Sequence, residues 1–347
     1  MYENCWPTAE LESGLSCPAC TNPERTILLK GLIDNVFFVA PGEWTLYRCT
    51  QCSSAYLDPR PTFESIGRAY TNYYTHDAVA PSTAVPFEKL GILRRLRRKL
   101  SNGYLNHRYG TKRQPSSKAG AILARMFPGL RRGLDFEFRF LPKPNKGDHL
   151  LDIGCGNGRL IVGLLEAGWQ ISGVELDPIA AKVARSIGID VTQGTIESLK
   201  QESDKYDAIT LSHVIEHVHD PRKLLQDVYR LLKPNGVVYI ETPNIDSHWA
   251  KLFRENWRGL ESPRHLILFT PRSLIDLLLS TGFSNIKTER RVDPQKHMYI
   301  SSKELTVRDS IELPKSINLS LNEKLNIFIS SFGKKKHLEF ITLIAKK

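Results

Sequence analysis

Short apolar runs alternate with amphipathic stretches over the second half of the chain. Runs with the length and composition of buried strands lie at residues 149–153, 170–175, 190–192, 206–211 and 236–241. Apolar positions recur with the period of a helix over residues 159–167, 178–187 and 222–232. Asp177-Pro178 and Asp220-Pro221 each place an N-cap residue before a proline suited to the first helical turn. This alternation predicts βαβ units around a parallel sheet, and the apolar run at 338–344 predicts one more strand.

The first part of the chain has a different pattern. Residues 35–39 and 44–47 are β-prone, whereas the stretch that follows them is basic and mostly helical in its spacing. Hydrophobic residues make up 41% of the chain, so it has enough apolar material for packed cores and is not disordered throughout. We predict a small module, a basic helical connector or lid, and an α/β domain, at residues 1–60, 61–140 and 141–347.

Four of the six cysteines form two close pairs. Each pair has the spacing C-x2-C, and 28 residues separate the pairs. Two such turns bring four thiolates into a tetrahedron around Zn²⁺ and leave no position open for chemistry. A redox disulfide at one pair would leave the other pair unexplained. We therefore predict a zinc ribbon with a structural zinc ion bound by Cys17, Cys20, Cys49 and Cys52.

A glycine-rich loop follows the first predicted strand and opens the first predicted helix. It reads Asp152-Ile-Gly-Cys-Gly-Asn-Gly158, and Glu175 closes the next strand 21 residues after Gly154. Glycines allow a sharp turn and the close approach of a ligand to the backbone. A carboxylate at the end of the second strand can accept both hydroxyls of a ribose. The third glycine comes one residue too early for a dinucleotide fingerprint.

This loop, together with Gly173-Val-Glu-Leu-Asp177, Tyr206-Asp207 and Leu231-Leu-Lys-Pro-Asn-Gly236, resembles class I S-adenosylmethionine-dependent methyltransferases. The resemblance implies a doubly wound, seven-stranded Rossmann-like sheet. It implies that Glu175 holds the ribose hydroxyls, that Leu176 packs on the adenine, and that residues 195–196 border the adenine. Many members of the family have an aspartate where Thr195 stands. The implied cofactor residues are Asp152, Gly154, Cys155, Gly156, Asn157, Gly158, Glu175, Leu176, Thr195, Ile196 and Ser212.

Candidate catalytic groups follow the fourth predicted strand. Methyl transfer to a hydroxyl benefits from a base near the reacting oxygen. Glu216 and His217 follow that strand, and His265 lies in a later loop. Two alternatives stay open. Glu216 and His217 cap the following helix, or these groups bind a divalent metal as in metal-assisted RNA 2′-O-methyltransferases, which have a glutamate where this chain has His213.

The substrate class is less closely defined. This arrangement, a zinc ribbon before such a domain, resembles two groups of enzymes. One group methylates sugars or other small metabolites, including those of surface polysaccharides, and the other methylates ribosomal RNA. The chain lacks Asn-Pro-Pro-Tyr and Pro-Cys after the fourth strand, which nucleobase methylation would favour. Thr242-Pro-Asn244, Trp257-Arg-Gly259 and Phe269-Thr-Pro271 resemble the small-molecule group. We expect O-methylation of a sugar or related small metabolite. The alternatives are RNA methylation and a cofactor-binding protein without activity.

The positive charge of the chain is concentrated in one segment. The net charge is +11, and residues 85–145 carry 15 Lys or Arg against three Asp or Glu. Leu93, Leu96 and Leu100 have helical spacing among five cations, and residues 122–132 are also amphipathic and basic. Three interpretations stay open: a solvated connector that packs its leucines on the α/β domain, peripheral contact with an anionic membrane, or nucleic-acid binding without a recognised motif.

The sequence has neither a membrane-spanning run nor a secretory signal, and these two features guide our expectation of where the protein is located. No run approaches the roughly 18 consecutive apolar residues that cross a bilayer. The first residues are acidic and lack the basic and apolar parts of a secretory signal. We expect a cytoplasmic protein, peripheral at the inner membrane face if the basic segment binds lipid.

Overall fold

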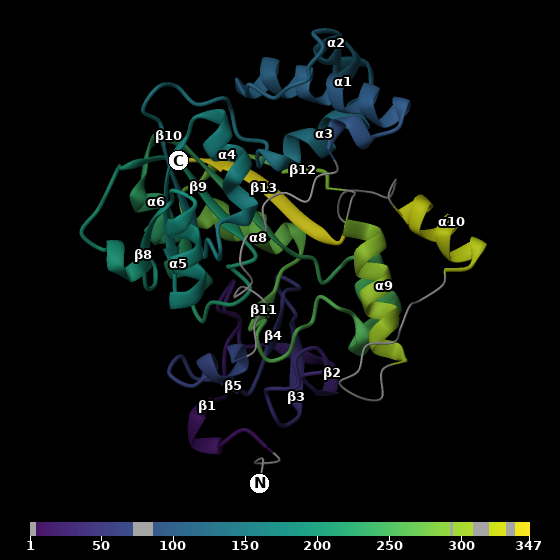
Figure 1. Ribbon diagram of the computed structural model, residues 1–347. Coiled ribbons are helices and arrows are strands. Elements are labelled where there is room, and N and C mark those ends of the chain that lie inside the picture. Colours follow the sequence, from purple (N-terminus) through teal and green to yellow (C-terminus); the bar gives the residue numbers. More distant parts are fainter. Residues whose placement is uncertain (1–4, 72–85, 292–293, 308–318, 331–336) are drawn as a thin grey trace. The chain divides into compact units, whose positions relative to one another are not determined.

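The computed structural model describes residues 5–71, 86–291, 294–307, 319–330 and 337–347 (Figure 1). Two compact units make up the chain. Unit 1 comprises Met1–Tyr73, Leu211–Tyr229 and Ile240–Lys347, and unit 2 comprises Tyr74–Thr210 and Arg230–Tyr239. The domain boundaries expected near residues 60 and 140 stay a prediction. The first four residues and part of the expected connector, residues 72–85, lie outside the described residues.

A seven-stranded sheet has the strand order β12-β13-β10-β9-β6-β7-β8. Its strands are β6 (His149–Ile153), β7 (Gln170–Glu175), β8 (Asp190–Gln193), β9 (Tyr206–Ser212), β10 (Leu232–Pro243), β12 (Ser284–Glu289) and β13 (Phe340–Lys346). β6, β7 and β8 pair in parallel, whereas β12 and β13 pair antiparallel. The predicted α/β class and seven-stranded sheet are confirmed, and β6 and β7 have the predicted bounds.

Helices connect these strands. They are η5 (Arg159–Ile161) with α4 (Val162–Ala167), α5 (Pro178–Ser186), η6 (Ile196–Leu199), α6 (Pro221–Leu231) and α8 (Pro271–Ser280). Of these, η5 with α4, α5 and α6 lie where the apolar period predicts helices. The carboxylate of Asp177 accepts the N–H groups of Ile179 and Ala180 and so caps α5. Asp220 accepts the N–H of Lys223 at 2.8 Å at the start of α6. Both predicted N-caps are confirmed.

The N-terminal part of unit 1 contains a β-hairpin between the two cysteine pairs. The hairpin belongs to a four-stranded sheet with the order β11-β4-β3-β2. The strands are β2 (Arg25–Leu32), β3 (Trp44–Cys49), β4 (Ala55–Leu57) and β11 (Ile267–Leu268). A second small sheet pairs β1 (Leu11–Glu12) with β5 (Arg60–Pro61). The strand β11 lies more than 200 residues later in the chain than its neighbour β4.

The β-prone residues 35–39 do not form a strand, so this prediction is wrong. These residues turn around the carboxylate of Asp34, which accepts the N–H groups of Phe37, Val39 and Ala40 at 3.1, 3.0 and 3.2 Å. An aspartate that satisfies three local backbone donors stabilises a turn more than β-propensity stabilises a strand.

A hydrophobic core in unit 1 joins the N-terminal sheet to the C-terminal half of the chain. Trp44 and Leu57 lie in one buried cluster with Trp249, Trp257 and Met298. The helices that contribute to this core are α7 (His248–Phe253), α9 (Pro294–Thr306) and α10 (Leu321–Ser330). The β2–β3–β4–β11 sheet therefore shares its apolar packing with residues far away in sequence.

The basic segment forms three helices in unit 2. They are α1 (Ile92–Tyr109), α2 (Ala119–Met126) and α3 (Pro128–Glu137). The hydroxyls of Tyr104 and Tyr109 both donate to Asp135, at 2.6 and 2.8 Å, and fix α1 to α3. The side chains of Leu93 and Leu96 are 82% and 52% exposed. The interpretation in which these two leucines pack on the α/β domain is therefore wrong. Among the described residues, no helix is both long and apolar enough to cross a bilayer.

Candidate functional site

The glycine loop has the backbone conformation that its sequence predicts. Gly154, Gly156 and Gly158 have φ values of +67°, +54° and +79°, which side chains disfavour. The N–H of Gly154 donates to the carbonyl of Val174 at 2.8 Å. A Cβ on Gly158 would lie 2.5 Å from Cδ1 of Ile189, so this position has no room for a side chain. The loop is thus fixed against β7 by its own backbone.

Glu175 lies at the end of β7 and contacts the same loop. Its Oε2 accepts the N–H of Gly156 at 2.7 Å, and its Oε1 accepts the N–H of Asp177 at 2.9 Å. Each carboxylate oxygen has capacity for a second hydrogen bond. Glu175 is therefore oriented by the backbone and still able to accept two hydroxyls, as its predicted role with a ribose requires.

Asp152 is the next-to-last residue of β6 and is buried. Only 4% of the residue is exposed, and its Oδ1 accepts the hydroxyl of Thr210. Burial raises the pKa of Asp152 to about 6. This carboxyl group therefore titrates close to neutral pH.

Two further predicted loop residues have local roles. The side chain of Cys155 is buried against β7, since a Cβ on Gly173 would lie 2.6 Å from its Sγ. The Oδ1 of Asn157 accepts the N–H of Arg159 at 3.2 Å, which shapes the turn into η5. Both residues support the loop, whatever further contacts a cofactor adds.

The remaining predicted cofactor residues lie at the ends of strands. Leu176 follows β7 and is 66% exposed. Thr195 follows β8 and caps η6, because its hydroxyl accepts the N–H of Glu197 at 3.3 Å, and Ile196 is buried behind it. These residues belong to unit 2, whereas Ser212, the last residue of β9, belongs to unit 1. Their predicted contacts with the cofactor stay predictions.

The four predicted zinc ligands lie together in unit 1. All four sulfur atoms lie within 4.8 Å of one another. Cys17 Sγ lies 3.6 Å from Cys52 Sγ, and Cys20 Sγ lies 3.5 Å from Cys49 Sγ. Sulfur atoms bound to one tetrahedral Zn²⁺ are about 3.8 Å apart, given a Zn–S bond of about 2.3 Å. The cluster therefore has the size and the donor set of a structural zinc site.

The backbone around the two cysteine pairs repeats one turn. The N–H of Thr21 donates to the carbonyl of Cys17 at 2.8 Å, and the N–H of Ser53 donates to that of Cys49 at 3.1 Å. Thr21 and Ser53 have almost equal φ values of +64° and +63°. The two pairs are thus matched turns that present their sulfur atoms to a common centre.

A buried charged cluster follows β9 in unit 1. Both ring nitrogens of His213 face carboxylates: Nδ1 lies 3.2 Å from Glu216 Oε1, and Nε2 lies 3.3 Å from Glu241 Oε1. Burial opposes its charged form, but the hydrogen bonds to both carboxylates raise the pKa of His213 to about 9. Although burial favours its neutral acid, the hydrogen bond from His213 lowers the pKa of Glu216. Glu216 is completely buried and ionised, and Thr242 donates to its second oxygen at 2.9 Å.

His217 and His265 lie side by side, with ring centroids 4.7 Å apart. The Nδ1 of His265 lies 2.8 Å from the carbonyl of Gly259, and the Nδ1 of His217 lies 3.0 Å from that of Arg264. A carbonyl only accepts hydrogen bonds, so each Nδ1 carries a proton, and in the neutral form of each ring Nε2 has the lone pair. The hydroxyl of Tyr70 also lies 2.9 Å from His217 Nδ1. Burial lowers the pKa of His265 to about 4, which keeps this ring neutral.

The predicted catalytic residues Glu216, His217 and His265 are therefore brought together. Their ligand atoms lie within 4.8 Å of one another. Two imidazole lone pairs beside a carboxylate suit proton transfer, and they are also a donor set that fits a divalent cation. Neither Glu216 nor His217 caps α6, where Asp220 has that role.

Sequence analysis missed the residues that hold this cluster. Arg264 is completely buried, and its Nη2 lies 2.6 Å from Asp34 Oδ1. Its guanidinium also lies over the ring of Phe37, 4.2 Å from the centroid, and donates to the carbonyl of Ala69 at 3.0 Å. Although burial opposes ionisation, the ion pair with Arg264 lowers the pKa of Asp34. No spacing or motif links these positions, so nothing in the sequence pattern could have indicated the pair.

Comparison with known proteins identifies part of the chain. Residues 123–288 match the family model described as a methyltransferase domain. The ubiquinone biosynthesis O-methyltransferase of Actinobacillus pleuropneumoniae is 36% identical over 109 residues, covering 28% of this chain and 47% of that protein. The enzyme of the same name from Xanthomonas oryzae is 35% identical over 105 residues, covering 28% and 44%. The matched region thus spans less than half of these relatives.

Among solved structures, a SAM-dependent methyltransferase from Archaeoglobus fulgidus aligns with 65% of this chain and 98% of its own, at 23% identity and a TM-score of 0.43. The family match covers the glycine loop, Glu175 and the strands β6 to β10. Residues 123–288 thus match a methyltransferase domain, and the seven-stranded sheet agrees with the predicted class I S-adenosylmethionine-dependent methyltransferase fold.

Proposed function

We propose that this protein transfers a methyl group from S-adenosylmethionine to a hydroxyl of a sugar or another small metabolite. The observation that carries the proposal is the pair of imidazole lone pairs at His217 and His265, beside the ionised Glu216. The relatives named as ubiquinone biosynthesis O-methyltransferases support oxygen as the acceptor atom. A sugar acceptor, for example in surface-polysaccharide synthesis, is our choice among small hydroxyl compounds.

The proposed roles of the cofactor-side residues follow from their hydrogen bonds. When bound, S-adenosylmethionine supplies a methyl group on a positively charged sulfur. Glu175 binds the ribose hydroxyls with the oxygen capacity left by its two backbone contacts. Asp152 and the glycine loop line the methionine and ribose side, and Leu176, Thr195 and Ile196 border the adenine.

The proposed chemistry on the acceptor side is an in-line displacement. The acceptor oxygen forms a bond to the methyl carbon while the carbon–sulfur bond breaks, and the hydroxyl proton passes to Nε2 of His217. The carbonyl of Arg264 and the hydroxyl of Tyr70 orient the ring so that this nitrogen is free. His265, with a pKa of about 4, is too weak a base to take the proton and instead accepts a hydrogen bond that orients the acceptor.

We propose that the four-cysteine cluster holds a structural zinc ion. With four sulfur donors the ion has no open position, so it takes no part in the methyl transfer. Its role is to fix the turns that begin and end the β2–β3 hairpin. Six free cysteines suit a reducing compartment, and we propose the cytoplasm as the site of the reaction.

The test is to incubate the full chain with methyl-labelled cofactor and separated cell fractions: soluble sugar nucleotides, lipid-linked material and total RNA. Label in either of the first two fractions, lost in a His217→Asn variant but kept in a His219→Asn variant, would support the proposal. Label in RNA alone would replace it with RNA methylation through the basic segment. Binding of the cofactor without label in any fraction would favour a protein without transferase activity.

A further inference from the structure

The α1–α2 hairpin of unit 2 is an unusually close helix pair. A Cβ on Gly103 would lie 1.7 Å from the carbonyl oxygen of Ser117, and one on Gly120 would lie 1.8 Å from that of Leu100. The N–H of Ser117 donates to the carbonyl of Lys99 at 3.0 Å. These contacts pack the N-terminal end of α2 against the middle of α1, and Figure 1 shows the two helices side by side.

Large apolar side chains are exposed on both helices. On α1, Ile92, Leu93 and Leu96 are 84%, 82% and 52% exposed, and on α2, Met126 is 65% exposed. Phe127 follows directly and is 56% exposed. Single exposed apolar residues are ordinary, but a group of this kind marks an interaction surface.

Exposed cations lie on the same two helices. Arg94 and Arg97 are exposed on α1, Arg125 is exposed on α2, and Lys118 is exposed directly before α2. Within the described residues, no salt bridge involves any of these four side chains. The surface therefore has free positive charge next to exposed apolar side chains.

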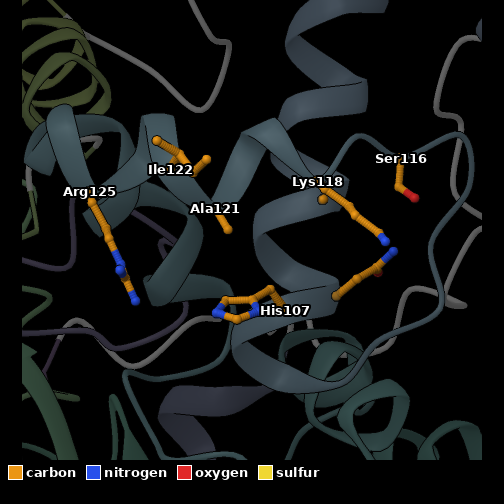
Figure 2. A pocket seen from close by; sticks show the side chains of 8 residues that line it. His107, Ser116, Lys118, Ala121, Ile122 and Arg125 are labelled. Carbon is orange, nitrogen blue, oxygen red and sulfur yellow. The ribbon is translucent and has the colours of Figure 1, made fainter.

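A cavity between the two helices has the same mixed character. Its volume is about 580 Å³, and its lining residues are Gly103, Asn106, His107, Ser116, Lys118, Ala121, Ile122 and Arg125. Figure 2 shows His107 on one helix, Ile122 and Arg125 on the other, and Lys118 with Ser116 near the connection. Three basic side chains, one hydroxyl and no carboxylate suit the phosphate of a lipid head group.

We propose that the α1–α2 hairpin docks on the surface of an anionic phospholipid bilayer. The exposed apolar side chains of the two helices lie at the boundary of the acyl chains, and the exposed cations contact lipid phosphates. A nucleic acid would use the cations but leave the apolar group in water. A second copy of this chain would bring two segments of net charge +12 together, which repel each other. The proposal does not depend on the acceptor of the methyl group.

The test is co-sedimentation of the full chain with vesicles of phosphatidylcholine alone or with roughly one quarter phosphatidylglycerol. We expect at least roughly tenfold stronger partitioning to the anionic vesicles. The Leu93→Ser/Leu96→Ser variant and the Arg94→Gln/Arg97→Gln variant should each lose about tenfold or more. The matched control is Leu279→Ser on α8, a leucine that is 55% exposed outside the hairpin and should partition like the unchanged protein.

Several results would overturn the proposal. Equal partitioning to both vesicles, no partitioning, or unchanged partitioning of both double variants would each do so. A change in oligomeric state of the leucine variant, seen by size-exclusion chromatography, would assign the surface to a second copy. Steeply salt-dependent binding of labelled RNA without vesicle binding would assign it to nucleic acid. If the leucine variant fails to fold, the arginine variant still decides the outcome, because its side chains are exposed and unpaired.

Discussion

The glycine loop of residues 152–158 and the histidine cluster around Glu216 are constructed in different ways. The loop is fixed by neighbours in the same βαβ unit: Gly156 contacts Glu175, which is 19 residues away. The histidine cluster depends on distant residues: Tyr70 contacts His217 across 147 residues, and Asp34 contacts Arg264 across 230 residues. One region is a local motif, whereas the other exists only when the N-terminal sheet has folded.

Because of this difference, we expect cofactor binding and the geometry of the histidine cluster to be lost independently of each other. Damage to the N-terminal sheet should impair the histidine cluster and leave cofactor binding intact. Damage to the glycine loop should do the reverse. The reason is that β11, which pairs with β4 in the N-terminal sheet, directly follows the loop that carries His265.

Removal of zinc should have the largest effect. Metal binding contributes about 10 kcal/mol or more to folding in small zinc modules, so a strong chelator should unfold the β2–β3–β4–β11 sheet and abolish methyl transfer. Cofactor affinity measured by calorimetry should change little. Metal analysis and thermal unfolding with and without chelator check this. A protein that contains no zinc and melts at the same temperature in chelator would contradict the structural role of Cys17, Cys20, Cys49 and Cys52.

The His217→Asn variant should lose activity about 10²-fold to 10⁴-fold, because a general base contributes by that amount. Asparagine keeps a polar side chain but offers no basic nitrogen. His219→Asn is the matched control, since His219 is a nearby histidine whose Nε2 donates to the carbonyl of Pro61 at 2.9 Å. Turnover and cofactor affinity should be measured separately. Equal losses in both variants would point to a structural role for His217.

The Asp34→Asn variant should be destabilised by about 3–5 kcal/mol, since it removes the closer of the two carboxylates that face the buried Arg264 and leaves only Glu261 at 3.7 Å. The control is Asp276→Asn, which breaks an exposed pair with Arg272 and should cost less than about 1 kcal/mol. Urea unfolding gives both values. We expect Asp34→Asn also to lower turnover, whereas its cofactor affinity stays unchanged. Unchanged turnover would mean that the histidine cluster does not depend on the Asp34 turn.

The Glu175→Ala variant should bind S-adenosylmethionine roughly a hundredfold more weakly, because two hydrogen bonds to a charged group contribute about 3 kcal/mol. It should not change the stability of the N-terminal sheet. Asp190→Ala, which removes an exposed carboxylate on the neighbouring strand β8, is the control. Calorimetry measures both affinities. Undiminished affinity of Glu175→Ala would exclude the ribose assignment.

The pH dependence of stability should show the smallest effect. The pKa of His213 is about 9 in the folded protein and about 6.5 unfolded, so its contribution is full below pH 6.5 and is lost as the pH rises through 9. His213 is 34% exposed, so solvent screening reduces this contribution to about 1 kcal/mol. Urea unfolding at both ends of this range, for the unchanged protein and His213→Gln, measures the difference. Identical pH slopes would contradict the bridging role of His213.

Much of the sheet could be predicted because its signals are local. The apolar runs at β6 and β7 and the N-caps at Asp177 and Asp220 depend on neighbours within a few residues. The glycine loop could also be located, because its φ values demand glycine wherever the loop occurs. The cysteine spacing likewise predicted a cluster that the fold brings together.

Other features could not be predicted, because distant partners decide them. Residues 35–39 have β-propensity, but the Asp34 carboxylate turns them, and Asp34 is itself held by Arg264. Leu93 and Leu96 have the spacing of a buried face but lack a covering element within the described chain. Whether a helical apolar face is buried depends on what packs against it, which the period of the sequence does not contain.

The sequence by itself determined the α/β class, the glycine loop with Glu175, and the identity of the cysteine and histidine candidates. The reason is that strand alternation, helix period, capping and positive φ are properties of a few consecutive residues. Only the tertiary structure decided that Tyr70 and the Asp34–Arg264 pair hold His217, and that β11 completes the sheet beside the four cysteines. Those contacts join residues up to 230 positions apart, and burial makes each of them depend on the packing of the whole unit.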